Sequence, residues 1–296
     1  MTFYKHIFLS VLFVLLCISA SSQTKRALLI GISEYQSTPS VSSESEWNNI
    51  HGANDVSLLS PTLEKQGYRI TKLCNKLATA DRIRKNLRTL ARNCQKGDLV
   101  YLHFSCHGQP VEDFDGDEGD GWDEAIIPVD AKKVYQKNKY TGENHITDDE
   151  LNKYFRDIRN KIGPNGFVYI VVDACHAGSS YRGDEEEDSV VVRGTNRGFS
   201  PSGKFYAPKN DKRGKLKVEK SPLMANICII EACRSYQVNS EIREKGHYYG
   251  SLSYYVNKVL QTTKLGQDIT WIKQVERLMD NDVRLVKQNI VIETSL

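Results

Sequence analysis

Residues 167–178 read FVYIVVDACHAG: a short run with apolar side chains on both faces, followed by Asp173, Cys175 and a glycine. A run of this kind is typical of a parallel strand that helices cover on both sides. A second stretch, LVYLHFSCHG at 99–108, has the same plan and also ends in reactive side chains before a glycine. Each stretch predicts a buried strand with chemical groups at its exit and a glycine that permits a sharp turn.

On either side of these two stretches, further apolar runs alternate with helical patterns along the chain. Strands are predicted at 25–31, 68–73, 99–105, 167–173 and 225–232. Helices are predicted, from apolar residues at helical spacing, at 54–66, 79–93, 147–162, 251–260 and 269–287. We expect Thr79 or Asp81 to cap the start of the helix at 79–93, and Thr147 to cap the start of the helix at 147–162. This alternation predicts an α/β fold with a mainly parallel sheet flanked by helices on both faces, whose chemistry lies beyond the carboxyl ends of the strands.

The composition is that of an ordinary globular protein. The chain has 296 residues, of which 40% are hydrophobic and 26% charged, and its net charge is +3. These values exclude a wholly disordered chain, and the charge is too small to indicate nucleic-acid binding. Seven cysteines are too few and too scattered for a disulfide scaffold. Because several lie in apolar strand-like runs, we expect mostly free thiols rather than three disulfides.

The first 22 residues have the parts of a secretory signal peptide. Lys5 and His6 precede an apolar run at 7–18, and small residues follow at 19–22. The apolar run is shorter than the roughly 20 residues that a membrane-spanning helix needs, which argues against the alternative of a membrane anchor. We therefore expect residues 1–22 to be removed and the mature chain to be exported, to the periplasm or the cell exterior.

Two stretches interrupt the alternation of strands and helices. Residues 112–124 (EDFDGDEGDGWDE) carry eight acidic side chains and no basic one. Residues 180–222 have no helical or strand period, and nine Lys or Arg residues occur between Arg193 and Lys220. A loop of that length in a compact domain is often functional or disordered.

His107 and Cys175 follow the predicted strands at 99–105 and 167–173. If these strands are neighbours, both side chains lie above the same sheet edge. A cysteine attacks as a thiolate, and a nearby histidine lowers the thiol pKa and later returns a proton. The backbone N–H groups of Gly108 and Cys175 would hold the developing oxyanion. The pair predicts nucleophilic cysteine catalysis, although either residue alone would suit a structural role.

A zinc site is the alternative for the same strand exits. Enough nitrogen and sulfur ligands for a tetrahedral site are present, namely His103, Cys106, His107, Cys175 and His176. Against zinc, no C-x2-C pair occurs, and His103 and His107 fall on opposite sides of the strand end. We expect His176 to shape the turn rather than to act as the base.

The surroundings of His107 and Cys175 resemble two motifs of one enzyme family. YLHFSCHG at 101–108 resembles the Ser-Gly-His-Gly motif of caspase-like cysteine peptidases, and VDACHAG at 172–178 resembles the Asp-x-Cys-His-Ser-Gly motif of their metacaspase branch (clan CD, family C14). Other similar stretches are ALLIGISEY (27–35), GAND (52–55), DGDEGDGWDEAIIPVD (115–130), ITDDE (146–150) and IEACRSYQVNSE (230–241). The resemblance covers about residues 25–262.

Two positions depart from the family pattern. Cys106 stands where the family usually has glycine, and it would either crowd the turn or offer a redox partner to Cys175. Ala177 replaces the usual serine. Neither change removes a catalytic group, so an active enzyme is still expected.

The resemblance implies a caspase-like fold with a six-stranded, mainly parallel sheet. It divides the mature chain into a large-subunit-like part at 23–179, a flexible linker at 180–222 and a small-subunit-like part at 223–296. It also implies an endopeptidase that needs no cofactor for its chemistry. Its S1 pocket would be lined by Asp55, Ser105 and Asp173 and would accept Arg or Lys at P1. By the same resemblance, calcium would activate the enzyme through Asp123, Asp148 and Asp149, with a fourth carboxylate near Asp184.

The linker at 180–222 is expected to be the site of self-processing. Arg193 and Arg197 each precede glycine, and unstructured loops are where proteolytic cuts concentrate. Binding of nucleic acid or an anionic surface by the basic run is the weaker alternative. For the whole chain, the alternatives are a non-catalytic binding module of this fold and a clostripain- or gingipain-like peptidase. The expected partners are protein or peptide substrates with a basic P1 residue; we expect a monomer with no nucleic acid and no stable membrane association.

Overall fold

The structure, a computed structural model, describes residues 23–35, 45–113, 116, 121–175, 191–195, 197–203, 218–285 and 288–296. The expected signal peptide at 1–22 lies outside these ranges, and so do His176, Ala177 and Asp184. Within them, no helix combines the length and apolar character that crossing a bilayer requires.

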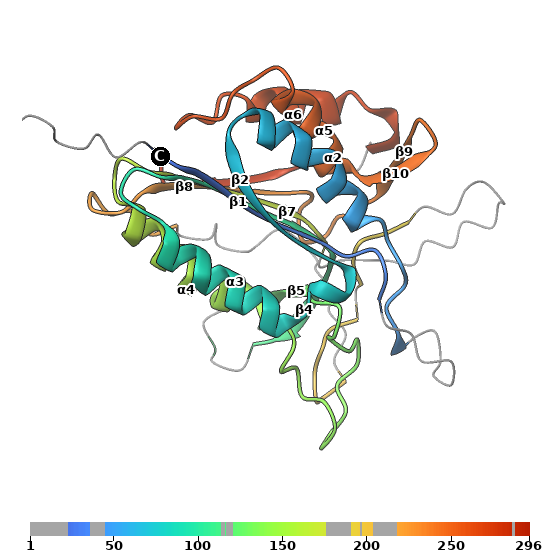
Figure 1. The fold of residues 1–296 in the computed structure, drawn as a ribbon. Helices are drawn as coiled ribbons and strands as arrows, with labels where there is room; N and C mark the ends of the chain where they lie inside the picture. Colours follow the sequence, from blue (N-terminus) through green and yellow to red (C-terminus); the bar gives the residue numbers. More distant parts are fainter. Residues whose placement is uncertain are drawn as a thin grey trace, which may run out of the picture.

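A six-stranded sheet forms the centre of the molecule (Figure 1). Its order is β11-β8-β7-β3-β1-β2, and every neighbouring pair is parallel except β11 with β8. The strands are β1 (Lys25–Gly31), β2 (Tyr68–Cys74), β3 (Leu99–Ser105), β7 (Phe167–Asp173), β8 (Asn226–Glu231) and β11 (Val291–Thr294). The mainly parallel α/β sheet is therefore confirmed. The apolar runs in the sequence predict five of these strands. The sixth, β11, which they do not predict, is a short antiparallel edge strand.

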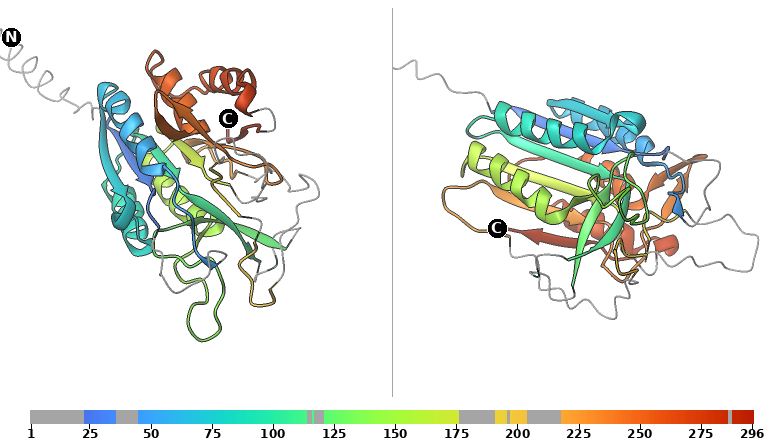
Figure 2. Two further views of the ribbon diagram at one scale, coloured as in Figure 1. Left: turned by 90° about the vertical axis from the view of Figure 1, so that its right-hand side faces the viewer. Right: turned by 90° about the horizontal axis from the view of Figure 1, so that it is seen from below.

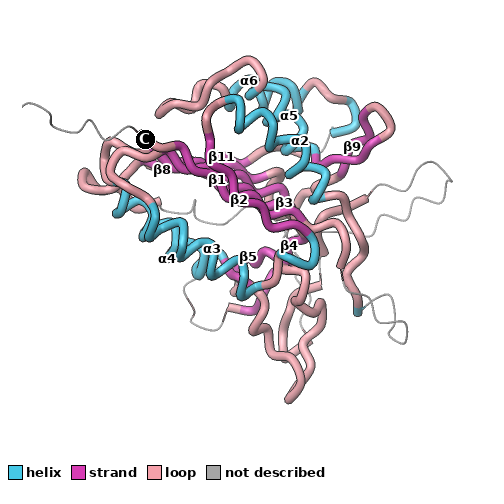
Figure 3. The backbone as a smooth tube through the Cα atoms, in the orientation of Figure 1, coloured by secondary structure: helices cyan, strands magenta, loops and turns pink. Residues whose placement is uncertain are grey.

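Helices cover both faces of this sheet (Figures 1 and 3). One face carries α3 (Ala80–Asn93) and α4 (Asp148–Ile162), and the other carries α2 (Gly52–Lys65), α5 (Ser251–Leu260) and α6 (Ile272–Asp280). Thr79 and Thr147 cap α3 and α4, as expected, by accepting the N–H groups of Arg82 and Glu150.

The single helix expected at 269–287 is wrong, because α6 ends at Asp280 and a short 3-10 helix follows at Val283–Leu285. The Asp282 side chain accepts the Arg284 N–H, a local bond that competes with continued helix. A second short 3-10 turn, Asn75–Leu77, follows β2.

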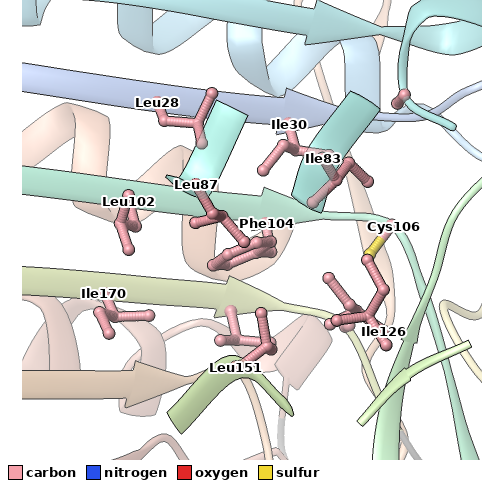
Figure 4. Packing of buried hydrophobic residues seen from close by; sticks show 14 of the residues in the cluster. Leu28, Ile30, Ile83, Leu87, Leu102, Phe104, Cys106, Ile126, Leu151 and Ile170 are labelled. Atoms are coloured by element: carbon pink, nitrogen blue, oxygen red, sulfur yellow. The ribbon is translucent and has the colours of Figure 1, made fainter. Parts of the chain in front are cut away.

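Side chains alternate between the two apolar layers along each strand, because successive residues of a strand point to opposite faces. Figure 4 shows one layer. It joins side chains of the sheet to those of α3 and α4, among them Leu28, Ile30, Leu102, Phe104, Ile170, Ile83, Leu87 and Leu151. The opposite layer joins the sheet to α2, α5 and α6, and includes Leu29, Tyr101, Val171, Leu59, Val256 and Val275.

Two small antiparallel units accompany the main sheet (Figure 2). One is the three-stranded unit of β4 (His107–Glu112), β5 (Trp122–Ile127) and β6 (Ile146–Thr147). The other is the hairpin of β9 (Glu241–Glu244) and β10 (His247–Gly250). Only Cys106 separates the end of β3 from the start of β4 at His107, so the sharp turn expected at Gly108 is wrong. The chain bends at Cys106, and Gly108 lies in extended strand.

The start of α2 approaches the ends of β1 and β3 unusually closely. A Cβ atom on Gly52 would lie 2.2 Å from the Ser105 carbonyl oxygen, and one on Gly31 would lie 2.4 Å from the Gly52 carbonyl oxygen. Only glycine tolerates backbone contacts this short. These two glycines therefore let the first turn of α2 bring Asp55 against the carboxyl end of the sheet.

Candidate active site

The two reactive strand exits meet, as the sequence predicts. β3 and β7 are neighbours in register, with Ser105 opposite Asp173, so both chains leave the sheet at the same level. The N–H groups of Gly108 and Cys175 both donate to one oxygen, the backbone carbonyl of Arg193, at 3.3 and 2.9 Å. The two N–H groups expected to form an oxyanion hole therefore converge on a single point.

His107 is held in one orientation by its surroundings. Its ring stacks on Trp47 with centroids 4.8 Å apart, and its Nε2 lies 2.8 Å from the Asn48 carbonyl oxygen, to which it donates. Its backbone N–H donates to the Tyr35 hydroxyl. Nδ1 finds no hydrogen-bond partner among the described residues. Burial lowers the pKa of His107 to about 3. The imidazole is thus neutral, and its Nδ1 lone pair is available to take a proton.

Cys175 is buried beside a second thiol. Its Sγ donates to the Gln237 carbonyl oxygen at 2.9 Å and lies 3.2 Å from Sγ of Cys233. The turn at 233–237, which follows β8, therefore holds the thiol on one side. All six cysteines from Cys74 to Cys233 are free thiols in the structure, as expected.

Asp55, Ser105 and Asp173, the three residues expected to line the S1 pocket, surround the side chain of Arg193. Nη1 of Arg193 lies 2.7 Å from the Asp55 carboxylate, 2.7 Å from the Ser105 hydroxyl and 3.5 Å from the Asp173 carboxylate. A fourth residue, Glu241, accepts from Nε and Nη2 at 3.0 and 2.8 Å. The Arg193 side chain and all three carboxylates are fully buried.

Hydrogen bonds from the fold hold the carboxylates in place. Asp55 accepts from the Ser105 hydroxyl and the Gly250 N–H. Asp173 accepts from the Asn239 amide and from the N–H and hydroxyl of Ser253. Since each acid already has partners from the scaffold, the pocket is pre-organised for a cation.

Burial and the guanidinium set the protonation of the pocket. Burial raises the pKa of Asp55 to about 7, against the opposing effect of Arg193. Burial would also raise the pKa of Asp173, but Arg193 and the hydrogen bonds from Asn239 and Ser253 hold it below its usual value. Burial opposes the charge of Arg193, but Asp55, Asp173 and Glu241 together raise its pKa well above the ordinary value. The pocket therefore strongly favours a permanent cation.

The backbone on either side of Arg193 is also held. The Arg193 N–H donates to the Asn239 carbonyl at 3.1 Å, the Glu241 N–H donates to the Val191 carbonyl at 2.9 Å, and Val192 pairs antiparallel with Ser240. Residues 191–193 thus add a short strand beside 239–241, the way extended peptides bind to sheet edges. Some residues of the described linker are buried, among them Arg193 and Phe199, whereas residues 201–203 are exposed.

Gly194 lies directly over Cys175. A Cβ atom on Gly194 would lie 2.1 Å from the Cys175 carbonyl oxygen and 3.0 Å from the Cys175 Cβ. Any larger residue would clash with the backbone there. The backbone at Gly194 therefore lies against the backbone and Cβ of Cys175.

The remaining expected residues lie elsewhere. The Arg197 carbonyl accepts from the Gln109 amide. Among the described residues, the acids around Arg193 make ion pairs with Arg193 and not with Arg197. His103 pairs with Ser253 on the α5 side of the sheet, whereas Cys106 packs in the opposite layer near Ile126 (Figure 4). No set of three or more metal-binding side chains gathers within the described ranges. His103 and Cys106 thus do not join His107 and Cys175 in a zinc site.

Asp123 and Asp148 lie where two neighbouring elements meet. Asp148 and Asp149 open α4, and Asp148 accepts the Glu124 N–H at 3.2 Å, which brings β5 to the start of that helix. Asp123, Asp148 and Asp149 all lie in the described ranges, but no set of three or more metal-binding side chains gathers there. The structure therefore does not bring these three acids together as a metal site, and the fourth expected acid, Asp184, lies outside the described ranges.

Sequence reasoning missed three residues that contact the site. Glu241, Cys233 and Gln237 all come from the stretch 230–241, which was noted only as a matching segment. The sequence signal for these residues is that a thiol and an acid follow a predicted buried strand. Their positions depend on how the turn after β8 folds back over Cys175, which no local pattern indicates.

The chain is similar in sequence to metacaspases and in fold to a solved structure. The chain is 28% identical over 280 residues to metacaspase-1B of Neosartorya fischeri and 35% identical over 174 residues to metacaspase-1B of Aspergillus fumigatus. These alignments cover 82% and 55% of this chain, but only 63% and 37% of the relatives' own lengths. Protein GSU0716 from Geobacter sulfurreducens has a similar fold, with a TM-score of 0.62, 20% identity, and coverage of 92% of this chain and 93% of that one.

The family comparison covers most of the chain. The caspase domain model, of peptidase family C14, matches residues 24–289. That range includes every strand of the main sheet except β11, both strand exits and the residues around Arg193. The match shows that the chain belongs to the caspase domain family.

Proposed function

We propose that the protein is a cysteine endopeptidase in which Cys175 is the nucleophile and His107 the general acid and base, and which cleaves after basic residues. The observation that carries this proposal is the placement of Arg193. Its side chain fills an acidic pocket while its carbonyl oxygen accepts from the Gly108 and Cys175 N–H groups. A P1 residue of a peptide substrate would make the same two sets of contacts.

The chemistry follows from the groups present. His107 Nδ1 takes the thiol proton, and the Cys175 thiolate attacks the carbonyl carbon of the P1 residue. The Gly108 and Cys175 N–H groups then stabilise the negative charge on the carbonyl oxygen. His107 returns the proton to the leaving amine, and water hydrolyses the thioester. Because the resting thiol donates to Gln237, Cys175 must rotate away from that carbonyl before His107 can take its proton.

Activity of variants tests this assignment. Cys175→Ala and His107→Ala should lose at least about 10³-fold in kcat/KM on an arginyl fluorogenic peptide, because each removes a group that acts in the bond-breaking step. Far-ultraviolet circular dichroism of each variant controls for folding. Wild-type rates in a folded Cys175→Ala or His107→Ala protein, or cleavage after Asp but not after Arg, would contradict the proposal.

Glu241 favours arginine over lysine at P1. It accepts from both Nε and Nη2 of Arg193, whereas Asp55 and Ser105 contact only Nη1. A lysine has one terminal nitrogen and cannot place donors against both groups at once. The pocket should therefore accept both cations but bind the guanidinium more tightly.

Replacing Glu241 should change this preference. Glu241→Gln keeps the size of the side chain but removes the charge, so kcat/KM for an arginyl peptide should fall about 10- to 100-fold, as expected for loss of charge-assisted hydrogen bonds. The lysyl peptide should lose less, so the Arg-to-Lys ratio should decrease. Glu64→Gln, on the exposed side of α2, is the matched control. An unchanged ratio in Glu241→Gln would show that another residue sets it.

The chain's own Arg193–Gly194 bond is the proposed self-processing site. Of the two arginines expected, only Arg193 has its side chain in the pocket and its carbonyl at the converging N–H groups. As an internal segment it meets the thiol at high effective concentration. Until it is cut it also keeps other substrates out of the pocket.

Sequencing of the fragments tests the cleavage position. Wild-type protein should give two bands on a denaturing gel, and the new amino terminus should begin at Gly194. Cys175→Ala should stay a single band. Arg193→Lys, which keeps a cation in the pocket, should be cut more slowly, whereas Arg197→Ala should be cut like wild type. A new terminus at Gly198, or an active wild type that is never cut, would overturn this site.

Calcium activation is part of the proposal. Asp148 and Asp149 lie together at the start of α4, and Asp123 comes from the adjoining strand β5. Carboxylate oxygens are the ligands that Ca²⁺ prefers, and the acids also suit the positive end of the helix dipole. Export to the periplasm or the cell exterior, where calcium is available, likewise remains a prediction from residues 1–22.

Removal of the metal tests this part. Activity should fall in excess EGTA and return with added Ca²⁺ but not with equal Mg²⁺, because Mg²⁺ demands a smaller, more regular site. Asp148→Asn should raise the calcium concentration needed for half-maximal activity. Equal activity in chelator and in calcium would exclude calcium as an activator.

A further inference from the structure

The thiols of Cys175 and Cys233 form a close, isolated pair. Their sulfur atoms are 3.2 Å apart, both side chains are buried, and together they make a small apolar cluster separate from the two main layers. Both sulfurs also approach the same carbonyl oxygen, that of Gln237, at 2.9 and 3.6 Å. The mechanism of peptide cleavage gives Cys233 no task.

Cys106, the thiol expected to be a redox partner of Cys175, does not lie beside it. Its side chain packs among Phe104, Ile126 and other apolar residues of the layer under α3 and α4 (Figure 4). That layer does not include Cys175. Cys233 is therefore the thiol in contact with the nucleophile.

We propose that Cys233 is a resolving cysteine that forms a reversible disulfide with Cys175 when the protein meets a peroxide. The proposal rests on the proposed function in one respect, namely that Cys175 is the reactive nucleophile. The disulfide would switch the peptidase off and would keep Cys175 from further, irreversible oxidation.

The disulfide forms in two steps. His107 takes the Cys175 thiol proton, the thiolate attacks one peroxide oxygen, and the O–O bond breaks. The departing hydroxide takes that proton from His107 and leaves as water, and Cys175 becomes a sulfenic acid. The sulfur of Cys233 then attacks the sulfenic sulfur, the S–O bond breaks, and the Cys233 proton leaves with the hydroxide as a second water. Two thiols are oxidised and one peroxide is reduced. A dithiol reductant reverses the reaction by exchange.

The geometry permits the bond. A disulfide needs its sulfurs at about 2.05 Å, so the pair must close by roughly 1 Å. Cys233 lies just after β8 in a turn, not within a strand, so a small shift there leaves the sheet pairing intact. Closing the pair gives up the thiol hydrogen bonds to the Gln237 carbonyl. The hydrogen bond to Cys175 and burial raise the pKa of Cys233, which disfavours the thiolate of Cys233.

Mass spectrometry after hydrogen peroxide treatment tests the proposal. Reduced wild-type protein should lose about 2 Da, and a digest should yield a linked peptide pair containing Cys175 and Cys233. Dithiothreitol should restore both the mass and the starting activity. In Cys233→Ser and Cys233→Ala, Cys175 should instead gain about 32 Da as sulfinic acid, and dithiothreitol should not restore each variant's own starting activity. Cys106→Ala, the matched control, should behave like wild type.

Other outcomes contradict the proposal. A wild-type protein whose Cys175 goes to sulfinic acid as fast as in Cys233→Ser would overturn it, and so would a disulfide from Cys175 to Cys106. The mass readout needs no turnover, so the two proposals fail separately. A Cys175–Cys233 disulfide in a protein without peptidase activity would sink the proposed function alone, whereas an active enzyme that forms no such disulfide would sink the resolving role alone.

Discussion

One buried cation organises the carboxyl end of the sheet. Arg193 is fully buried and is tolerated there only because Asp55, Asp173 and Glu241 compensate its charge. These partners come from α2, from the end of β7 and from β9, so the ion cluster ties three separate parts of the chain to the linker. Removing one partner of such a buried pair typically costs about 3–5 kcal/mol. The cluster therefore holds the part of the linker around Arg193 against the carboxyl end of the sheet.

The same ion cluster explains why Cys175 and His107 are not poised to react. With Arg193 in the pocket, its carbonyl occupies the two converging N–H groups, and Gly194 covers Cys175. The Cys175 thiol donates to the Gln237 carbonyl. The imidazole of His107 is neutral, because burial disfavours the charged form of that ring. A neutral pair costs less to bury than a thiolate and an imidazolium would. In this account, one arrangement has three results. Arg193 makes the contacts of a substrate residue, the uncut enzyme is inactive, and the Cys175 thiol is protected.

Local sequence patterns predicted the strands that support the site, but not the segments that fold over it. The strands that carry His107 and Cys175 are buried runs with clear ends, and the resemblance to metacaspases supplied Asp55, Ser105 and Asp173. Strand β11 was missed because four residues with a half-exposed pattern carry little signal. Glu241 and Cys233 were missed because their roles depend on the turn after β8. The burial of Arg193 was missed because its basic, glycine-flanked surroundings are typical of exposed loops.

Binding of a peptide to the pocket tests the central claim, that Arg193 occupies the place of a substrate residue. The measurement is calorimetry of acetyl-Val-Val-Arg-amide, which copies residues 191–193, against two uncleavable proteins, Cys175→Ala and Cys175→Ala with Arg193→Ala. The account predicts that the peptide binds the double variant and not the single one, because only the double variant has an empty pocket. Equal binding to both proteins, or binding to neither, would contradict it.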